Sequence, residues 1–309
     1  MKYLVTGASG PFATAAIEEF LKIVPAQDLI LMSRKPEKLE KWAKLGCATR
    51  YGDFKEPNSI EAAAQGAGKM LMISGYEVGH RILQHGNTID AAVRAGVKHI
   101  AYTSYYGKDG VDDLACIDHR GTEENLKSSG VAYTSLRDGM YMESIISAFL
   151  PNFYQSGFWI TCTNGGKISM ADRLDCAACA VHVLTSEGHE NKIYEITGND
   201  TWSFDEINDL AEEITGVHIE YRDVSDQEFY TYMKGLGIPD DSLEEFNVNG
   251  LAWCLNDIMS SERVIRAGGR DIVSNDIKTI LGREPVKFRD FMWENAERLR
   301  AIAKQNAKN

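Results

Sequence analysis

The sequence predicts an α/β fold: a doubly wound parallel sheet with a smaller, helix-rich C-terminal region. Over the first half of the 309 residues, short apolar runs alternate with segments of helical periodicity, which is the pattern of parallel strands joined by crossover helices. In addition, a glycine turn, Gly7-x-x-Gly10-x-x-Ala13, stands between the first apolar run and the first helical segment. A strand, a glycine turn and a helix in succession are typical of sheets that bind nucleotides.

The elements follow one another in a regular order. Buried strands are predicted at 3–5, 28–32, 48–51, 69–73, 99–103 and 132–136, with helices between them at 14–21, 37–45, 59–64, 81–95 and 117–128. Parallel strands end at one edge of their sheet, and such sheets bind ligands beyond that edge. We therefore expect the chemistry at the residues that follow strand ends, which are Gly7, Arg34, Asp53, Ser74, Thr103 and Arg137.

Past residue 150 this rhythm breaks. The aromatic stretch 151–166 is predicted as an irregular loop, 177–185 as a helix and 192–196 as a strand, and helices are predicted again at 205–214, 226–236, 240–246 and 276–281. We therefore divide the chain into a nucleotide-binding Rossmann domain, 1–150, to which 167–197 returns, and a smaller substrate or lid region formed by 151–166 and 198–309.

Composition narrows the class of protein. A formal net charge of -12 disfavours non-specific nucleic-acid binding, because phosphates would be repelled. No apolar run approaches the ~20 residues that span a bilayer, so no membrane partner is expected and a cytoplasmic location is the default. The six cysteines lack a disulfide-framework spacing, and Cys176-x-x-Cys179-x-x-His182 lies on an apolar helical segment. We interpret that motif as core packing and expect no metal.

The glycine turn predicts a pyrophosphate site. Gly7 permits the tight turn, Gly10 lets the backbone approach the phosphates, and the free N–H groups at the helix start bind them. Arg34 and Lys35 follow the second strand, where an NAD-specific site carries an acid; two cations there favour NADP over a merely solvated basic turn. Asp53 either bonds the adenine amino group or closes its own turn.

The usual acid of short-chain reductases is missing. A Tyr-x-x-x-Lys pair donates a proton to a carbonyl in such enzymes, but Tyr51/Lys55 and Tyr230/Lys234 lie away from the helix after the fifth strand, where the pair belongs. His119 stands near the expected lysine position. It either holds a ribose hydroxyl or a substrate oxygen, or is an ordinary helix-face histidine with a local partner.

Aromatic residues are dense at two places along the chain. They either wall a flat apolar pocket over the nicotinamide or pack an ordinary core between sheet and lid, and the sequence does not decide between these. The residues are Tyr105, Tyr106, Tyr141, Phe149, Phe153, Tyr154, Phe158 and Trp159.

Several motifs together resemble the NmrA-like, atypical short-chain dehydrogenases, and most of all their branch of NADPH-dependent quinone oxidoreductases and triphenylmethane dye reductases. The likeness covers about residues 1–290. It is carried by Gly7-Ala-Ser-Gly10, Val24-Pro25-Ala26, Arg34 with Pro36-Glu-Lys, Tyr51-Gly-Asp53, Glu77-Val-Gly with His85, Ala95-Gly-Val-Lys-His-Ile-Ala-Tyr-Thr-Ser104, His119 with Thr122-Glu123, Leu136-Arg137 and Tyr194-Glu. This sequence departs from the family's pattern at Pro11, at Gly75-Tyr76 and at Asp138, where an Asn is frequent.

The resemblance implies a set of site residues. Gly7, Ala8, Ser9, Gly10, Pro11 and Phe12 would wrap the pyrophosphate, and Arg34 would take the 2′-phosphate. Gly75, Tyr76 and Glu77 would line the path from adenosine to nicotinamide. Around the nicotinamide and the substrate mouth it implies Asp138, Gly139, Met140, Tyr141, Met142, Glu143 and Arg173. With Lys35, Asp53, Ser74 and Thr103 this is the predicted NADP-binding set, and His119, Tyr76 and Tyr141 are the candidate catalytic side chains.

The function expected from these observations is hydride transfer from NADPH to a quinone or a similarly flat, electron-poor aromatic. Such acceptors need no strong acid, so a missing Tyr–Lys pair is tolerable. The alternative is a non-catalytic NADP(H)-binding redox sensor that acts through a protein partner. The expected partner of the enzyme is a small aromatic substrate, and a homodimer is kept as a hypothesis.

Overall fold

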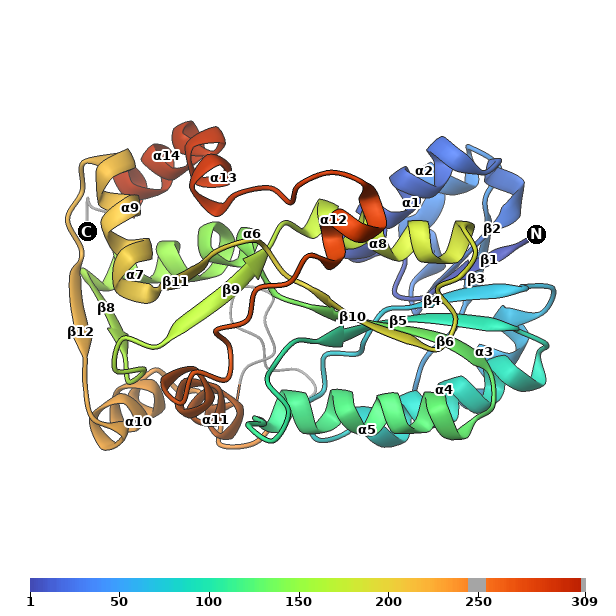
Figure 1. Ribbon diagram of the computed structural model, residues 1–309, viewed down its shortest axis with the longest axis horizontal. Coiled ribbons are helices and arrows are strands. Elements are labelled where there is room, and N and C mark those ends of the chain that lie inside the picture. Colours follow the sequence, from blue (N-terminus) through green and yellow to red (C-terminus); the bar gives the residue numbers. More distant parts are fainter. Residues whose placement is uncertain (244–253, 307–309) are drawn as a thin grey trace.

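A computed structural model describes residues 1–243 and 254–306 (Figure 1). In the described part of the chain, seven strands form one parallel sheet in the order β10-β6-β5-β4-β1-β2-β3. The strands are β1 (Tyr3–Val5), β2 (Leu29–Ser33), β3 (Ala48–Tyr51), β4 (Lys69–Met72), β5 (His99–Tyr105), β6 (Ala132–Asp138) and β10 (Lys192–Ile196). The order reverses beside β1, which confirms the predicted doubly wound sheet.

Helices cover both faces of this sheet (Figure 1). One face carries α1 (Pro11–Ile23), α2 (Glu40–Ala43), α8 (Arg173–Thr185) and α12 (Asp276–Leu281), and the other carries α3 (Pro57–Ala64), α4 (Arg81–Arg94) and α5 (Leu114–Ser128). Short 3-10 turns, η1 (Ala26–Asp28) and η2 (Pro36–Leu39), precede β2 and α2. The alternating strand residues feed two separate apolar cores, with Val5 in one and Leu4 in the other.

A second group of elements lies beyond the carboxyl ends of the strands, at the left of Figure 1. A three-stranded sheet has the order β11-β9-β7, and β12 pairs with β8. The strands are β7 (Met140–Tyr141), β8 (Phe158–Thr161), β9 (Lys167–Ala171), β11 (Thr201–Ser203) and β12 (Glu220–Asp223). Around them lie α6 (Met142–Ser144), the π-helical turn η3 (Ile145–Phe149), α7 (Leu150–Ser156), α9 (Phe204–Thr215), α10 (Asp226–Gly235), α11 (Leu255–Arg266), α13 (Phe288–Glu294) and α14 (Ala296–Asn306).

The loop predicted over 151–166 is confirmed only at 162–166 and is wrong over 151–161. Residues 142–156 are helical and β8 follows directly. Pro151 follows directly on the π-helical turn η3, and Gly157 ends the helix with φ 79°. Pro151 therefore lies within the helical segment that begins at Met142, and Gly157 ends it.

Several predicted helices also differ in extent, and α1, α5 and α8 begin earlier than predicted. The segment 37–45 is a 3-10 turn followed by the four-residue α2, and α3 begins at Pro57, so Ser59 lies inside the helix and does not cap it. Of the helix predicted at 240–246, residues 240–243 are not helical and the rest lies outside the described residues. The division into two domains stays a prediction.

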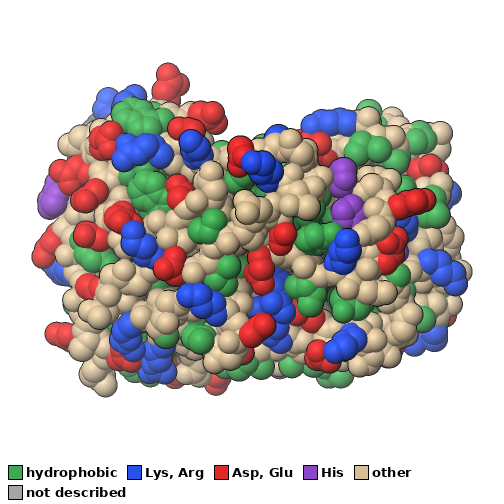
Figure 2. Space-filling model, in the orientation of Figure 1, with side chains coloured by type: hydrophobic (Ala, Val, Ile, Leu, Met, Phe, Trp, Pro, Cys, Tyr) green, Lys and Arg blue, Asp and Glu red, His purple; other side chains and the backbone are tan. Residues whose placement is uncertain are grey.

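Charged side chains of both signs are interspersed over the face of the molecule that Figure 2 shows. None of the helices described is both long and apolar enough to cross a membrane.

Candidate functional site

Two hollows lie beyond the carboxyl ends of the strands, and they meet at Ser74, which lines both. The first, here called the groove, measures about 500 Å³ and runs along the ends of β1, β2, β3 and β4. The second, here called the cavity, measures about 340 Å³ and lies between the sheet and the second group of elements. The groove and the cavity therefore adjoin at Ser74.

The glycine turn forms one wall of the groove. Gly7 has φ +57°, a conformation that favours glycine, and a Cβ on Gly10 would lie 3.3 Å from the carbonyl oxygen of Gly7. Gly10 is also the N-cap of α1, whose first turn contains no acidic side chain. The turn thus leaves a close backbone approach at a helix N-terminus, which is the environment that a pyrophosphate requires.

Cationic side chains lie at the far end of the groove. Arg34 Nη1 donates to the Tyr76 hydroxyl at 3.3 Å, and the guanidinium lies over the Tyr76 ring at 5.5 Å. Lys35 and Lys38 line the same end. Asp53 lies here too, and its Oδ1 accepts from the backbone N–H of Lys55 at 3.0 Å. One carboxylate oxygen of Asp53 therefore closes its own turn.

Side-chain hydroxyls fix the strand ends between groove and cavity. Thr6 Oγ1 accepts from the N–H of Ile73, and Thr103 Oγ1 accepts from the N–H of Ser74, both at 2.9 Å. Thr103 is buried and lines neither hollow. It positions Ser74 through the backbone.

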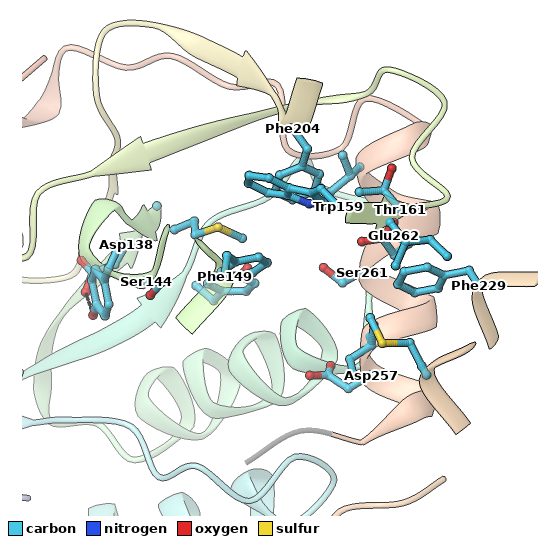
Figure 3. Close-up of a pocket in the computed structure, with 18 of the residues that line it drawn as sticks. Asp138, Ser144, Phe149, Trp159, Thr161, Phe204, Phe229, Asp257, Ser261 and Glu262 are labelled. Carbon is cyan, nitrogen blue, oxygen red and sulfur yellow. Dashed lines mark hydrogen bonds between the residues drawn. The ribbon is translucent and has the colours of Figure 1, made fainter. Parts of the chain in front are cut away.

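Aromatic rings wall one side of the cavity (Figure 3). Phe153 stacks on Trp159 with ring centroids 4.5 Å apart, and Phe149 stacks on Phe204 at 6.0 Å. Of the eight aromatic residues singled out in the sequence, Tyr105, Tyr141, Phe149, Phe153 and Trp159 line the cavity. Phe149, Phe153 and Trp159 also pack in the apolar core of the second group of elements. The packing interpretation is therefore confirmed for these three rings, and a place over the nicotinamide stays a prediction.

Helix α11 forms the opposite wall. Asp257, Ser261 and Glu262 project from it toward the open space (Figure 3). Burial raises the pKa of Asp257 to about 6 and that of Glu262 to about 7. Among the described residues that line the cavity none is Lys or Arg. The cavity therefore has acidic rather than basic character.

Asp138 stands at the end of β6, across the cavity from α11. Its Oδ2 accepts from the Tyr141 hydroxyl at 2.9 Å, and burial raises the pKa of the carboxyl to about 8. Phe12 packs on the Tyr141 ring with centroids 6.0 Å apart, and the Arg173 guanidinium lies 5.2 Å from the ring centroid. Tyr141 is thus held between the helix that follows the glycine turn and the start of α8.

His119 reaches the cavity from α5. Its Nδ1 lies 2.7 Å from the Tyr102 hydroxyl, and burial lowers the pKa of the imidazole well below its ordinary value. The sequence did not single out Tyr102, which is fully buried on β5, as a functional residue. The only sequence feature that could have indicated Tyr102 was its position on the predicted strand that precedes the helix of His119.

The predicted site residues fall into three groups. The groove holds Gly7, Ser9, Gly10, Pro11, Arg34, Lys35, Asp53, Ser74, Gly75, Tyr76 and Glu77. The cavity holds His119, Asp138, Gly139, Met140 and Tyr141. Neither is lined by Ala8, Phe12, Thr103, Met142, Glu143 or Arg173. Tyr76, a candidate for catalysis, lies with Arg34 outside the cavity, whereas His119 and Tyr141 lie inside it.

The motifs set aside in the sequence have structural partners. Tyr230 and Lys234 lie on α10, and the Tyr230 hydroxyl and Lys234 Nζ both bond Asp240. Cys176 and Cys179 are fully buried in the apolar core, as predicted. Among the described residues no group of His, Cys, Asp and Glu side chains is placed to hold a metal ion.

Comparison with known proteins agrees with this geometry. The NmrA-like family model matches residues 1–258. The chain is 38% identical to Quinone oxidoreductase 2 of Escherichia coli over 239 residues, 76% of this chain and 82% of that protein. It is 26% identical to the NAD(P)H azoreductase of Xenophilus azovorans, over 79% of this chain and 84% of that protein.

Solved structures give the same result. The Escherichia coli NADPH-dependent quinone oxidoreductase complexed with NADPH superposes with a TM-score of 0.84 at 32% identity, covering 96% of this chain and 99% of that one. Triphenylmethane reductase of Citrobacter complexed with NADP(H) gives 0.81 at 30%, covering 99% and 100%. These relatives confirm the resemblance inferred from the sequence: the chain belongs to the NmrA-like family.

Proposed function

We propose that this NmrA-like chain transfers a hydride from NADPH to a quinone or a similarly flat, electron-poor aromatic bound in the cavity. The observation that carries the proposal is the meeting of groove and cavity at Ser74. A dinucleotide with its pyrophosphate at Gly10 and its 2′-phosphate at Arg34 would bring its nicotinamide end to the cavity.

The cofactor and the reaction class rest on two supports. The residues of the groove fit NADPH for two reasons. A Cβ on Gly10 would lie 3.3 Å from the Gly7 carbonyl oxygen, so the turn is built for a residue without a side chain, which leaves room for a pyrophosphate beside the backbone. Arg34 and Lys35 stand where an NAD-specific site carries an acid. Relatives that match nearly the whole chain were crystallised with NADPH or NADP(H). The chain is accordingly an NADPH-dependent oxidoreductase.

The substrate class rests on the walls of the cavity. Stacked rings of Phe149, Phe153, Trp159 and Phe204 offer flat apolar surface, which matches a planar aromatic acceptor. NADPH supplies the hydride, and the chain's own residues align the acceptor and exclude water. A sensor that only bound the nucleotide would have no need of such a pocket.

The test is NADPH oxidation by the purified protein with neutral quinones, dyes and ketones as separate acceptors. We expect turnover with the planar quinones and slower or no turnover with simple ketones. Micromolar NADPH binding without acceptor-dependent oxidation would refute the proposal and favour the sensor.

A matched pair of variants ties the activity to the cavity. Ser144→Trp places a large ring beside the aromatic wall and should raise KM for the acceptor, since Ser144 lines the cavity. Ser147→Trp lies one turn further along on an exposed position and should leave KM unchanged.

A further inference from the structure

A row of hydrogen bonds runs from Gly75 in the groove through His85 and Tyr102 to His119 in the cavity. Its first donor, the Gly75 N–H, determines which atom donates at each later step. The backbone N–H of Gly75 donates to His85 Nε2 at 3.0 Å. A backbone amide cannot accept, so His85 Nε2 carries no proton. Burial, with nearby Arg81, lowers the pKa of His85 to about 3, so the ring is neutral and its one proton lies on Nδ1.

Thr122 supports the same assignment independently. Its hydroxyl donates to the carbonyl oxygen of Asp118 at 2.9 Å, which uses its only hydrogen. The 3.0 Å contact between Thr122 Oγ1 and His85 Nδ1 therefore requires that His85 donate. Both partners of His85 lead to the Nδ1–H tautomer.

Tyr102 passes the direction on to His119. Its oxygen lies 3.4 Å from His85 Nδ1 and 2.7 Å from His119 Nδ1. Since His85 Nδ1 holds a proton, Tyr102 can only accept there. Tyr102 also bonds Thr122, but an imidazole nitrogen is a stronger acceptor than a hydroxyl oxygen, and the contact with His119 Nδ1 is short, at 2.7 Å. We therefore assign the Tyr102 O–H to His119 Nδ1. Burial raises the pKa of Tyr102, so the phenol keeps this hydrogen. His119 Nδ1 accepts, and the proton of the neutral His119 ring lies on Nε2.

The second nitrogen of His119 is free to act on a ligand. His119 lines the cavity beside Ser74, Ser104 and Tyr105. No described group forms a hydrogen bond with His119 Nε2. The atom is also not sealed off inside the protein, so a ligand in the cavity can reach it. We propose that His119 presents Nε2–H to the oxygen of the acceptor, in a tautomer that Tyr102 and His85 hold in place. The role rests on the proposed function, whereas the tautomer does not.

The ring acts as a neutral donor rather than as an acid. Burial disfavours its charged form, and so do the charged or titratable groups that face it, which are Arg81 and His85 on α4, Arg120 on α5 and Arg270 after α11. When an acceptor gains the hydride that NADPH supplies, negative charge develops on its oxygen. A fixed N–H stabilises that charge.

The proton balance follows from the start of this row. The Gly75 amide cannot release its proton to His85, so this row of hydrogen bonds cannot replace a proton that His119 gave away. His119 therefore keeps its proton, and water supplies the one that neutralises the reduced acceptor. His119 is the catalytic residue here, and Tyr102 and His85 are positioning residues.

The direct test is a nitrogen-15 NMR correlation spectrum of the full chain labelled at histidine, with His119 assigned by His119→Gln. We expect the signature of a neutral ring protonated at Nε2, unchanged between about pH 6 and 9. A ring protonated at Nδ1, or one that titrates in this range, would overturn the proposal without bearing on whether the enzyme reduces quinones.

Two tyrosine variants test the positioning role. Tyr102→Phe should release the tautomer, so that an Nδ1–H signal appears, and should lower kcat by about 2- to 10-fold with KM little changed. Tyr106→Phe is the matched control, because Tyr106 is equally buried and its hydroxyl bonds no described group. Equal spectra and equal kcat for the two variants would refute the role of Tyr102.

The activity assay separates the two proposals. His119→Ala should lower kcat for quinones by about a hundredfold, with NADPH affinity retained. If the Nε2–H signature is present but wild-type protein reduces no acceptor, the proposed function fails and so does the catalytic role of His119.

Discussion

Arg34 Nη1 and the Tyr76 hydroxyl lie 3.3 Å apart in the groove, where the guanidinium also faces the tyrosine ring. Arg34 comes from the end of β2 and Tyr76 from the segment after β4. The pair therefore joins two strand ends on either side of β1, over the place where the adenosine end of a dinucleotide would lie. The hydrogen bond and the ring contact together hold the Arg34 guanidinium in one orientation in the groove.

The first prediction concerns cofactor choice. Arg34→Glu should weaken NADPH binding by about 10- to 100-fold, because a charge-assisted hydrogen bond to the 2′-phosphate is lost. NADH binding should change little. Fluorescence titration of both cofactors measures the ratio, with Tyr76→Phe as the control that removes only the hydroxyl. An unchanged ratio in Arg34→Glu would remove Arg34 from the phosphate site.

The second prediction concerns Asp138 and pH. Its folded pKa, about 8, lies above the ordinary value of 3.8, so the folded protein holds this proton more tightly than the unfolded chain. The stability it contributes is fully present below about pH 4 and falls as pH rises toward 8, by up to about 1.4 kcal/mol per pH unit.

Asp138→Asn keeps the shape of the side chain and removes the titration. Urea denaturation should show the variant gaining on wild type as pH rises from about 5 to 8. A difference between the two proteins that does not vary with pH would contradict the raised pKa. The comparison isolates Asp138, because Asp257 and Glu262 titrate in both proteins.

The third prediction concerns the charge of the acceptor. Asp257 and Glu262 face the cavity, and their pKa values, about 6 and about 7, mean that both ionise as pH rises to 8. Quinones that bear a sulfonate should therefore show lower kcat/KM than neutral ones, and more so at pH 8 than at pH 6. Glu262→Gln should reduce this discrimination by a few-fold. Equal discrimination in the variant and wild type would show that Glu262 does not act on the substrate.

The fourth prediction concerns the support behind the cavity. The fully buried Arg270 forms an ion pair with the fully buried Asp113 and lies 4.2 Å from the centroid of Tyr105, which lines the cavity. Arg270→Met should destabilise the fold by about 3–5 kcal/mol, since it leaves Asp113 buried without its partner. The exposed pair Lys44–Glu40 provides the control, and Lys44→Met should have little effect. Similar denaturation midpoints for both variants would show that the Arg270–Asp113 pair does not stabilise the fold.

Local patterns in the sequence were sufficient for the parallel sheet and the groove. The strand at 3–5 and the turn at Gly7 and Gly10 are neighbours along the chain. Arg34 and Lys35 follow the next strand, which pairs with the first in parallel, so the strand–turn–helix–strand order places them at the same edge of the sheet.

The cavity could not be predicted in the same way. Its acidic wall belongs to α11, which we did not predict, although Leu255, Ile258, Met259 and Ile265 have helical spacing. Its aromatic wall includes α7, where Pro151 and Gly157 look like loop residues in the sequence. Tyr102 faces His85 and His119 only because α4 and α5 pack on the same side of β5. Such contacts depend on tertiary packing between segments that are distant in the sequence.

The most direct test of hydride transfer to an acceptor in the cavity uses NADPH deuterated at C4 of the nicotinamide, on one face or the other. Under saturating quinone, we predict acceptor-dependent oxidation that slows for one of the two deuterated cofactors and not for the other, because the groove fixes which face meets the cavity. NADPH that binds at Arg34 yet shows no quinone-dependent oxidation, or oxidation that slows equally for both faces, would contradict the account.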